Sequence, residues 1–443
     1  MAMILDRVQM PEMDPEVRVK SYDEAILGYS KKMAVEEALR CIDCKSKPCT
    51  YACPALTKAP EYIQAIAEED FDKSLALAVE TYPLPGTLGR TCFHPCEDAC
   101  VVGYKGEPVS ICALKRAAYD HGQWPEIIRP EPTGKTVGVV GGGPAGIQVA
   151  YDLIRKGHAV TIYEALPEMG GMMRYGIPGY RLPRDVLAFE MGKLQEWGVK
   201  LEMNWRLGEQ GSLQELLDKH DSVFLGTGCH SPKSIRTEGE DLPGVKHAVD
   251  WLRELELGEP KDLTDKRVVI IGGGSTAMDV SRNALRNGAK SVHIVYRRGR
   301  RQMTASPEEV VQARDERVKF LMFANPLRIV AGPNGEASFV ECAQMELGLP
   351  DESGRQRPEV IPHTEFMLKV DEVVLAVGQN PSDCSPLEGL VTLSKWGDIE
   401  VDDQCRTSHP KVFSAGDIAL GPSSIIESIG HARKAADSMH RSL

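Results

Sequence analysis

The sequence of 443 residues lacks several features that would assign it to a broad class of proteins. It has no apolar run of about 18 or more residues, so we expect no membrane-spanning helix. Its net charge of −12 argues against non-specific binding to nucleic acid. The opening MAMILDRVQMPEMDPEV has no basic segment followed by an apolar stretch and a cleavage site. We therefore expect no secretory signal and a cytoplasmic protein.

The composition is that of a chain that folds into several globular domains. Hydrophobic residues make up 42% and charged residues 26%, which is enough apolar surface for ordinary cores. The length predicts two to four domains. The 41 glycines indicate many tight turns and close backbone approaches to ligands.

The helical and strand patterns divide the chain. Residues 1 to about 130 are predicted to be mainly helical, since KKMAVEEALRCIDC (31–44) and APEYIQAIAEEDFDKSLALAVET (59–81) have helical apolar spacing. The Pro- and Gly-rich RPEPTG (129–134) reads as a linker. A β-α-β pattern follows it.

The first β-α-β unit carries a dinucleotide-binding turn. TVGVV is a short strand, PAGIQVAYDLIRKG a helix and HAVTIYEA a second strand, and the turn reads Gly141-x-Gly143-x-x-Gly146. Such glycines allow a tight turn, approach to a pyrophosphate and close packing of helix on strand. The helix N-terminus offers free N–H groups to phosphates. Glu164, 18 residues after Gly146, stands where a carboxylate holds ribose hydroxyls.

The same pattern returns 131 residues later, counted from Gly141 to Gly272. RVVIIGGGSTAMDVSRNALRNGAKSVHIVYRR is again strand, Gly-rich turn, helix and strand, with Ala277 as an accepted third residue. This is a repeat of a fold unit.

The end of that second strand differs from the first. Arg297 lies 20 residues after Ala277, where an acid would select NAD, and Arg298, Arg300 and Arg301 follow. Guanidinium groups suit a 2′-phosphate, so we expect NADP(H) in preference to NAD(H). The alternative is a solvated charge run after a strand.

Two dinucleotide units suggest one bound flavin and one exchanging nicotinamide. Near the C-terminus, Gly416 and Asp417 follow the strand KVFSA, and Asp417 is suited to the flavin ribityl or phosphate. A helix beginning at Ser424 would direct its dipole at the pyrimidine edge. The alternative is a simple N-cap; together with the first motif, the flavin is favoured.

The twelve cysteines are unevenly placed, with eight between residues 41 and 112. In a reducing compartment such a cluster indicates metal or redox chemistry before disulfides. Cysteines so spaced on turns converge on a cube of iron and sulfide. Zinc is the main alternative, but one zinc uses four thiolates and two zincs beside a flavin would be unusual. The candidate ligands are Cys41, Cys44, Cys49, Cys53, Cys92, Cys96, Cys100 and Cys112.

Several motifs together resemble one family. VGVVGGGPAGIQVAYDL, GGMMRYGIPGYRLP, IIGGGSTAMD with YRR, AVGQNP and SAGDIALGPSSIIESIGHARKAA are similar to the glutamate synthase small subunit family. It includes the N-terminal half of dihydropyrimidine dehydrogenase and the flavin subunits of bifurcating NADH-dependent ferredoxin:NADP oxidoreductases. The resemblance, over nearly the whole chain, implies FAD in the first unit, NADPH in the second, and a loop with Gly171 and Arg181 against the flavin.

The resemblance implies a fold and a set of contacts. The fold is α/β, with a helical iron–sulfur domain (1–132) before two Rossmann-like domains, the second (237–364) inserted between the two parts of the first (133–236 and 365–443). The candidate dinucleotide contacts are Gly141, Gly143, Pro144, Ala145, Gly146, Glu164, Gly171, Arg181, Thr227, Gly273, Gly274, Ser275, Thr276, Asp279, Arg297, Arg298, Gly378, Gly416, Asp417 and Ser424.

The resemblance also implies crossed cluster ligation. Cys41, Cys44 and Cys49 would share one [4Fe–4S] cluster with Cys100, while Cys53, Cys92 and Cys96 would hold three corners of a second. Related proteins often supply Gln or Glu as the fourth ligand, and Lys115 stands at that position here. The second cluster is therefore either absent or completed by Cys112, which is otherwise an inert buried thiol.

The proposed chemistry needs no catalytic acid or base, because a nicotinamide passes a hydride to a flavin that releases single electrons. The second unit has no C-x-x-C pair, which argues against a thioredoxin-reductase mechanism. There is no FMN-binding barrel and no N-terminal cysteine glutaminase domain. The electrons must pass to a redox partner subunit or, in a standalone reductase, to a carrier such as ferredoxin. A scaffold with decayed sites is a third hypothesis, opposed by the intact glycine sets.

Overall fold

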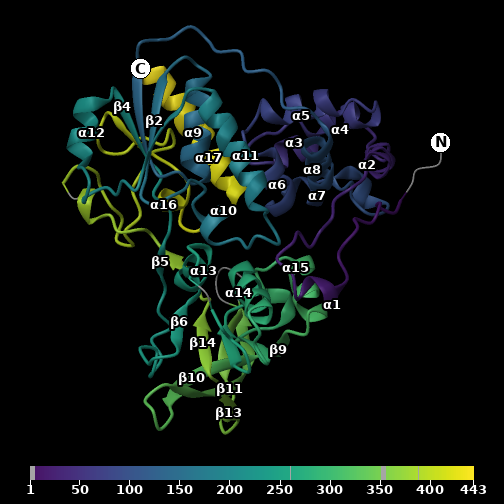
Figure 1. Cartoon of the computed structure of the whole chain (residues 1–443), viewed down its shortest axis with the longest axis vertical. Helices are drawn as coiled ribbons and strands as arrows, with labels where there is room; N and C mark the ends of the chain where they lie inside the picture. Colours follow the sequence, from purple (N-terminus) through teal and green to yellow (C-terminus); the bar gives the residue numbers. More distant parts are fainter. Residues whose placement is uncertain (1–4, 260, 351–355, 388) are drawn as a thin grey trace.

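The computed structural model describes residues 5–259, 261–350, 356–387 and 389–443, so the first four residues of the expected N-terminal domain lie outside it. A helical N-terminal region lies beside one α/β unit, and a second α/β unit lies below both (Figure 1). Among the described residues, no helix is long and apolar enough to cross a membrane.

The N-terminal region is helical, as the apolar spacing predicts. Its helices are α1 (Pro15–Arg18), α2 (Lys31–Ala38), α3 (Pro48–Ala52), α4 (Ala59–Ala67), α5 (Phe71–Val79), α6 (Pro85–Thr91), α7 (Pro95–Asp98), the 3₁₀ turn η1 (Val101–Tyr104) and α8 (Ile111–His121).

Two predicted helices are shorter than expected. Helix α2 ends at Ala38, before the first cysteines. The helix predicted over 59–81 is two helices, because Glu69 adopts a left-handed φ of 62° and Asp70 starts α5 as its N-cap. The Asp70 carboxylate accepts a hydrogen bond from the Lys73 N–H (2.9 Å), so the side chain competes with continued helix.

The first α/β unit is a parallel sheet in the order β16-β4-β1-β2-β3. Its strands are β1 (Thr136–Val140), β2 (Ala159–Glu164), β3 (Lys200–Met203), β4 (Ser222–Leu225) and β16 (Val412–Ser414). Its helices are α9 (Pro144–Ile154), α10 (Met172–Tyr175), α11 (Arg184–Glu196), α12 (Leu213–Lys219), α16 (Asp417–Leu420) and α17 (Ile425–Ser442). Because β16 returns from the C-terminal segment to pair with β4, the second unit is inserted into the first, as predicted.

The second unit is another parallel sheet, in the order β6-β14-β7-β8-β9. Its elements are β6 (Val245–His247), α13 (Ala248–Glu256), β7 (Arg267–Ile271), α14 (Ser275–Arg286), β8 (Ser291–Tyr296), η2 (Arg300–Gln302), α15 (Pro307–Asp315), β9 (Lys319–Met322) and β14 (Glu372–Leu375). An antiparallel extension consists of β10 (Ala324–Ala331), β11 (Ala337–Pro350), β12 (Gln356–Val360) and β13 (Phe366–Lys369).

The return to the first unit lies later than the boundary expected at residue 365. Strand β13 pairs with β11, and β14 lies between β6 and β7, so both belong to the second unit. The chain crosses back after Leu375, where β15 (Gln379–Asn380) pairs with β5 (Ser231–Pro232); the turn η3 (Ser385–Leu387) follows. The apolar run of β14 fits any central parallel strand, so its pattern alone does not identify its sheet.

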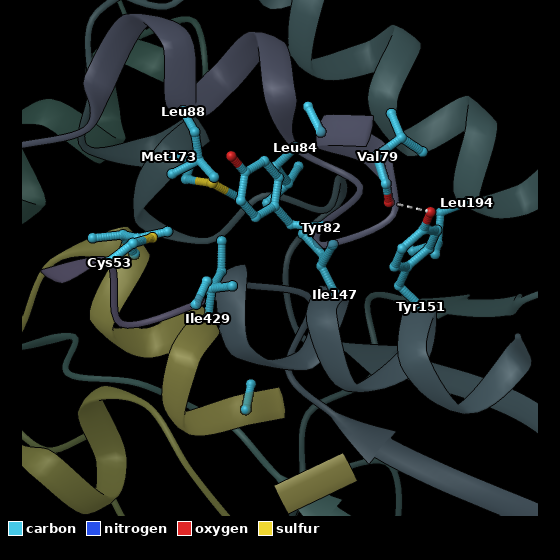
Figure 2. Close-up of a cluster of buried hydrophobic side chains, with 14 of the residues drawn as sticks. Cys53, Val79, Tyr82, Leu84, Leu88, Ile147, Tyr151, Met173, Leu194 and Ile429 are labelled. Carbon is cyan, nitrogen blue, oxygen red and sulfur yellow. Dashed lines mark hydrogen bonds between the residues drawn. The ribbon is translucent and has the colours of Figure 1, made fainter. Parts of the chain in front are cut away.

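One hydrophobic core joins the helical region to the first α/β unit. Figure 2 shows Cys53 and Tyr82 of the helical region among Met173 and Ile429 of the α/β unit. In the same core the Tyr151 hydroxyl donates to the Val79 carbonyl (2.7 Å). Thus the cysteine region packs against the dinucleotide-binding unit.

Candidate functional site

The first Gly-rich turn is crowded against the sheet. Gly141 has a φ of 103°, and a Cβ there would collide with the Gly226 carbonyl oxygen. A Cβ at Gly146 would collide with the carbonyl oxygen of Gly141, so α9 approaches its strand closely. These contacts require glycine and give the turn the geometry that lets a backbone approach a phosphate.

This turn borders a cavity of about 580 Å³. The volume is in the range of cofactor sites. Of the predicted dinucleotide contacts, it is lined by Gly141, Gly143, Pro144, Ala145, Glu164, Gly171, Thr227 and Asp417.

Glu164 connects the cavity to the glycine turn. Its carboxylate accepts hydrogen bonds from the backbone N–H of Gly142 (2.7 Å) and of Leu166 (2.8 Å). Burial raises the pKa of Glu164, while these N–H donors oppose the rise. The side chain is therefore fixed at the end of β2, facing the cavity, where a sugar hydroxyl can donate to it.

The opposite wall leaves room and an unused donor for a ligand. A Cβ at Gly171 would stand 2.9 Å from the Cα of Gly143, so the two glycines face each other. The Thr227 hydroxyl is buried with no hydrogen-bond partner. Because buried hydroxyls are normally paired, a ligand in the cavity would satisfy this one. The cavity thus fits a dinucleotide.

The C-terminal segment closes the cavity. Gly416 has a φ of 76°, and a Cβ there would lie 2.8 Å from the Ala145 Cβ. Asp417 accepts hydrogen bonds from the Ser423 hydroxyl (2.7 Å) and the Ser428 hydroxyl (3.1 Å), and burial raises its pKa. Ser424 is the N-cap of α17, in a capping box with Glu427, so its side chain is used within the helix.

Sequence reasoning missed several polar groups of the cavity, among them His230 and Arg253. Burial, with nearby Arg253 and Arg206, lowers the pKa of His230 to about 4, so its imidazole is neutral at pH 7. These residues follow β4 or lie on α13 of the second unit, and no local motif marks them.

The second Gly-rich turn has the same crowding. A Cβ at Gly272 would collide with the Ala376 carbonyl oxygen, and one at Gly273 would lie 2.6 Å from the Tyr296 ring. Gly274 is the N-cap of α14, with Thr276 half-buried in its first turn, and the Ser275 hydroxyl is buried without a partner. The N-terminus of α14 therefore retains a donor for a phosphate. Gly378 is exposed at the crossing between the units.

The arginines after β8 are available for an anion. Arg297 is exposed, and the Nε of half-buried Arg298 has no hydrogen-bond partner. No carboxylate of the described residues forms an ion pair with Arg297, Arg298 or Arg301. This unpaired positive charge fits the predicted 2′-phosphate.

Arg181 and Asp279 were expected to contact the two dinucleotides, but they contact each other. The Arg181 guanidinium donates to both Asp279 oxygens (2.8 Å each) and pairs with Glu309. Arg181 does not line the cavity. Since the loop holds α14 and α15 in this way, the pair ties the two α/β units together.

The first cysteine group converges on a small cavity. Cys41, Cys44, Cys49 and Cys100 line it together, although Cys100 lies on a separate segment. The grouping is the one implied by the family resemblance. Ile42 lines the same cavity and is 51% exposed, so this group lies near the surface.

The second group gathers the other four cysteines of the region. The thiols of Cys92 and Cys112 are within hydrogen-bond reach, and the fields of Cys53 and Cys92 act on Cys96. Cys53, Cys96 and Cys112 are buried. Among the described residues, no three ligand groups converge closely enough for a single metal ion. A cube of iron and sulfide separates its thiolates more widely, so clusters fit these groups better than zinc.

Comparisons with known proteins agree with this geometry. The family "Pyridine nucleotide-disulphide oxidoreductase" matches residues 135–437, and "Dihydropyrimidine dehydrogenase domain II, 4Fe-4S cluster" matches residues 18–126. The Escherichia coli glutamate synthase [NADPH] small chain is 33% identical over 98% of this chain and 96% of its own length.

Two further comparisons are less complete. The NADP(+)-dependent formate dehydrogenase subunit beta of Moorella thermoacetica is 40% identical, and this chain spans only 60% of its length. FprA of Mycobacterium tuberculosis, solved in complex with NADPH, aligns with a TM-score of 0.61 over 70% of this chain and 85% of its own. At 20% identity this likeness shows the fold alone.

The glutamate synthase match runs nearly end to end, and the two family matches meet at the linker between the helical and α/β regions. The chain therefore belongs to the pyridine nucleotide-disulphide oxidoreductase family, in the group of NAD(P)H-dependent oxidoreductases with the glutamate synthase small chain that combine FAD- and NADP(H)-binding units with a [4Fe–4S] domain.

Proposed function

We propose that this chain is the NADPH-oxidising subunit of a larger redox complex, and that it passes electrons through FAD and [4Fe–4S] clusters to a partner subunit, or in the reverse direction. Bound FAD supplies the conversion between hydride transfer and single-electron transfer. The protein's own residues position the nucleotides, exclude water and lead the electrons to the surface.

One observation carries the proposal: helix α17 contacts both the FAD cavity and the second cysteine group. Ile425, in its first turn, lines the cavity. Further along, a Cβ at Gly430 would lie 2.5 Å from the Pro54 carbonyl oxygen, directly after Cys53. Arg433 donates to the Ala55 carbonyl (2.6 Å). The flavin site and the thiols are thus separated by one helix.

The proposed residue roles follow the geometry. Gly141, Gly143 and the start of α9 hold the FAD diphosphate, Glu164 holds its ribose, and Asp417 lies by the ribityl chain. Gly273, Gly274 and Ser275 hold the nicotinamide nucleotide diphosphate, with Arg297 and Arg298 on the 2′-phosphate. Cys41, Cys44, Cys49 and Cys100 hold the first cluster.

The direction of electron exit has separate support. The cavity of the first cysteine group is bordered by the exposed Ile42, and the exposed Tyr51 and Tyr104 lie on the adjoining segments. Apolar groups at the surface near a redox centre suit contact with another protein. The names of the relatives, formate dehydrogenase subunit beta and glutamate synthase small chain, are those of subunits. A standalone reductase that uses a soluble carrier is the second candidate.

Anaerobic purification with iron, sulfide and flavin counted, followed by titration with NADPH and with NADH, tests the proposal. We expect FAD, at least one [4Fe–4S] cluster, and bleaching of the flavin at lower NADPH than NADH. A colourless, iron-free protein would contradict the redox function, and faster bleaching by NADH would contradict the assignment of the arginines. Co-purifying redox subunits would favour the complex, whereas activity of the isolated chain with ferredoxin would favour the standalone reductase.

A further inference from the structure

Cys112 lies in the second cysteine group and belongs to the first turn of α8. Its sulfur lies within hydrogen-bond reach of Cys92 and 3.2 Å from the Leu88 carbonyl oxygen at the end of α6. The fields of Cys92, Cys96 and Cys112 act on one another and on the same neighbours. Four thiols from three segments therefore surround one buried volume.

Lys115 stands one helical turn beyond Cys112, on the same face of α8. It is 4% exposed, and its ammonium acts electrostatically on Cys92, Cys96 and Cys112. Its Nζ lies 5.6 Å from the centre of the Tyr82 ring. No carboxylate of the described residues forms an ion pair with Lys115. A buried ammonium without a carboxylate needs another source of negative charge.

We propose that Cys53, Cys92, Cys96 and Cys112 bind a second [4Fe–4S] cluster, and that the buried Lys115 ammonium is the counter-ion of that cluster. This deepens the proposed electron-transfer function and rests on it. Four thiolates make a cluster more negative than three thiolates with a neutral side chain, and a cluster of higher negative charge is harder to reduce. Lys115 offsets that charge and raises the reduction potential.

The location gives the counter-ion a consequence for the path of electrons. Cys53 packs in the same core as Met173 and Ile429 of the flavin-binding unit, and Tyr82 lies beside them (Figure 2). The second cluster is thus the one next to the flavin site, while the first lies nearer the surface. A raised potential at the inner cluster favours electron flow from the flavin to that cluster.

The ligand assignment is tested with Cys112→Ala and Cys112→Ser. Iron and sulfide are counted in anaerobic protein, and EPR spectra are recorded after reduction by dithionite. We expect about eight irons per wild-type chain and the loss of one cluster's signal in both variants, with the other signal kept. Cys384→Ala, at a buried thiol in the other part of the molecule, is the matched control and keeps both. Two unchanged signals in Cys112→Ala, or about four irons in the wild type, would overturn the assignment.

The counter-ion assignment is tested with Lys115→Met, which keeps the length of the side chain and removes its charge. In an EPR-monitored titration, we expect the equilibrium constant for reducing one of the two clusters to fall about tenfold or more, which is about 59 mV for a one-electron couple. Lys115→Arg keeps the charge and the potential. Lys32→Met is the matched control, because Lys32 is 87% exposed on α2 of the same region.

An unchanged potential in Lys115→Met would overturn the counter-ion. If Lys115→Met loses the second cluster entirely, Lys115→Arg decides, because a charge role predicts that it retains the cluster and a loss there overturns the proposal. Reduction by dithionite needs no nucleotide. Failure of NADPH to reduce the flavin in a protein with both clusters would therefore count against the proposed function alone.

Discussion

At the scale of single residues, the arginines after β8 decide which nicotinamide nucleotide binds. The Nε of Arg298 is buried without a partner, and Arg298 forms no ion pair with any carboxylate of the described residues. A 2′-phosphate would supply charged hydrogen bonds, each worth about 1.5–3 kcal/mol. We expect Arg298→Ala to raise the Kd of NADPH about 10- to 100-fold and to leave that of NADH unchanged, as measured by flavin bleaching in stopped flow.

Arg314→Ala is the matched control for that variant, since Arg314 is an exposed arginine of α15 without an ion pair among the described residues. It should leave both nucleotides unaffected. An equal loss of affinity for NADPH and NADH in Arg298→Ala would mean that the side chain positions the fold and does not recognise the 2′-phosphate.

Single residues also show how far the sequence leads. Glu164 and Asp417 were predicted because each follows a strand at a fixed distance from a glycine turn, and both line the cavity. His230 and Arg253 line the same cavity without a motif. Their position depends on how the second unit sits against the first, which no local pattern encodes.

At the scale of elements, Gly430 shows two opposing effects within one helix. Alanine is intrinsically better than glycine inside a helix by about 1 kcal/mol. A Cβ at Gly430 would however lie 2.5 Å from the Pro54 carbonyl oxygen, and backbone there cannot yield cheaply. Overpacking of this kind costs about 1–3 kcal/mol, so the clash outweighs the propensity. We expect Gly430→Ala to lower the free energy of unfolding and to loosen the cluster at Cys53, measured by denaturation and iron retention.

Gly192→Ala in α11 provides the matched control. A Cβ at Gly192 meets nothing within 4 Å, so only the propensity remains. This variant should be stabilised by about 0.5–1 kcal/mol and keep all its iron. Stabilisation of both variants alike would show that α17 and the Cys53 turn are not in the close contact described.

The elements differ in how well they were predicted. The strand–turn–helix patterns gave β1, α9, β7 and α14 close to their observed bounds, because those signals are local. The break at Glu69 was missed because the apolar spacing continues across it, while a left-handed residue and the Asp70 cap divide the helix. The position of β14 was missed because strand pairing is a long-range property.

At the scale of the whole molecule, buried ion pairs connect distant segments. Glu316, fully buried, accepts hydrogen bonds from Arg18 (2.9 Å), Arg282 (2.6 Å) and Arg286 (2.7 Å). Arg18 belongs to α1 of the N-terminal segment, which reaches past the helical region to α15 of the second unit (Figure 1). One carboxylate therefore attaches the N-terminal segment to the NADP(H)-binding unit.

Glu316→Gln tests this attachment. The amide leaves buried guanidinium groups without a compensating charge, and breaking a buried pair costs about 3–5 kcal/mol. We expect a lower denaturation midpoint and earlier proteolysis of the N-terminal segment around α1. Glu16→Gln is the matched control: Glu16 pairs with Arg317 between the same two segments, but both side chains are exposed. An exposed pair contributes about 0–1 kcal/mol, so that variant should resemble the wild type.

The same carboxylate predicts a dependence on pH. Burial opposes ionisation of Glu316, but the hydrogen bonds from Arg282 and Arg286 outweigh it and hold its pKa below the ordinary value. A group with a lowered folded pKa contributes stability above its unfolded pKa, about 4.3, and loses it as the pH falls through the folded pKa. Glu316→Gln has no such group. The difference in unfolding free energy between wild type and variant should be full at pH 7 and should shrink below about pH 4, measured by urea denaturation in matched buffers. A difference independent of pH would show that packing, and not the charge of Glu316, holds the N-terminal segment in place.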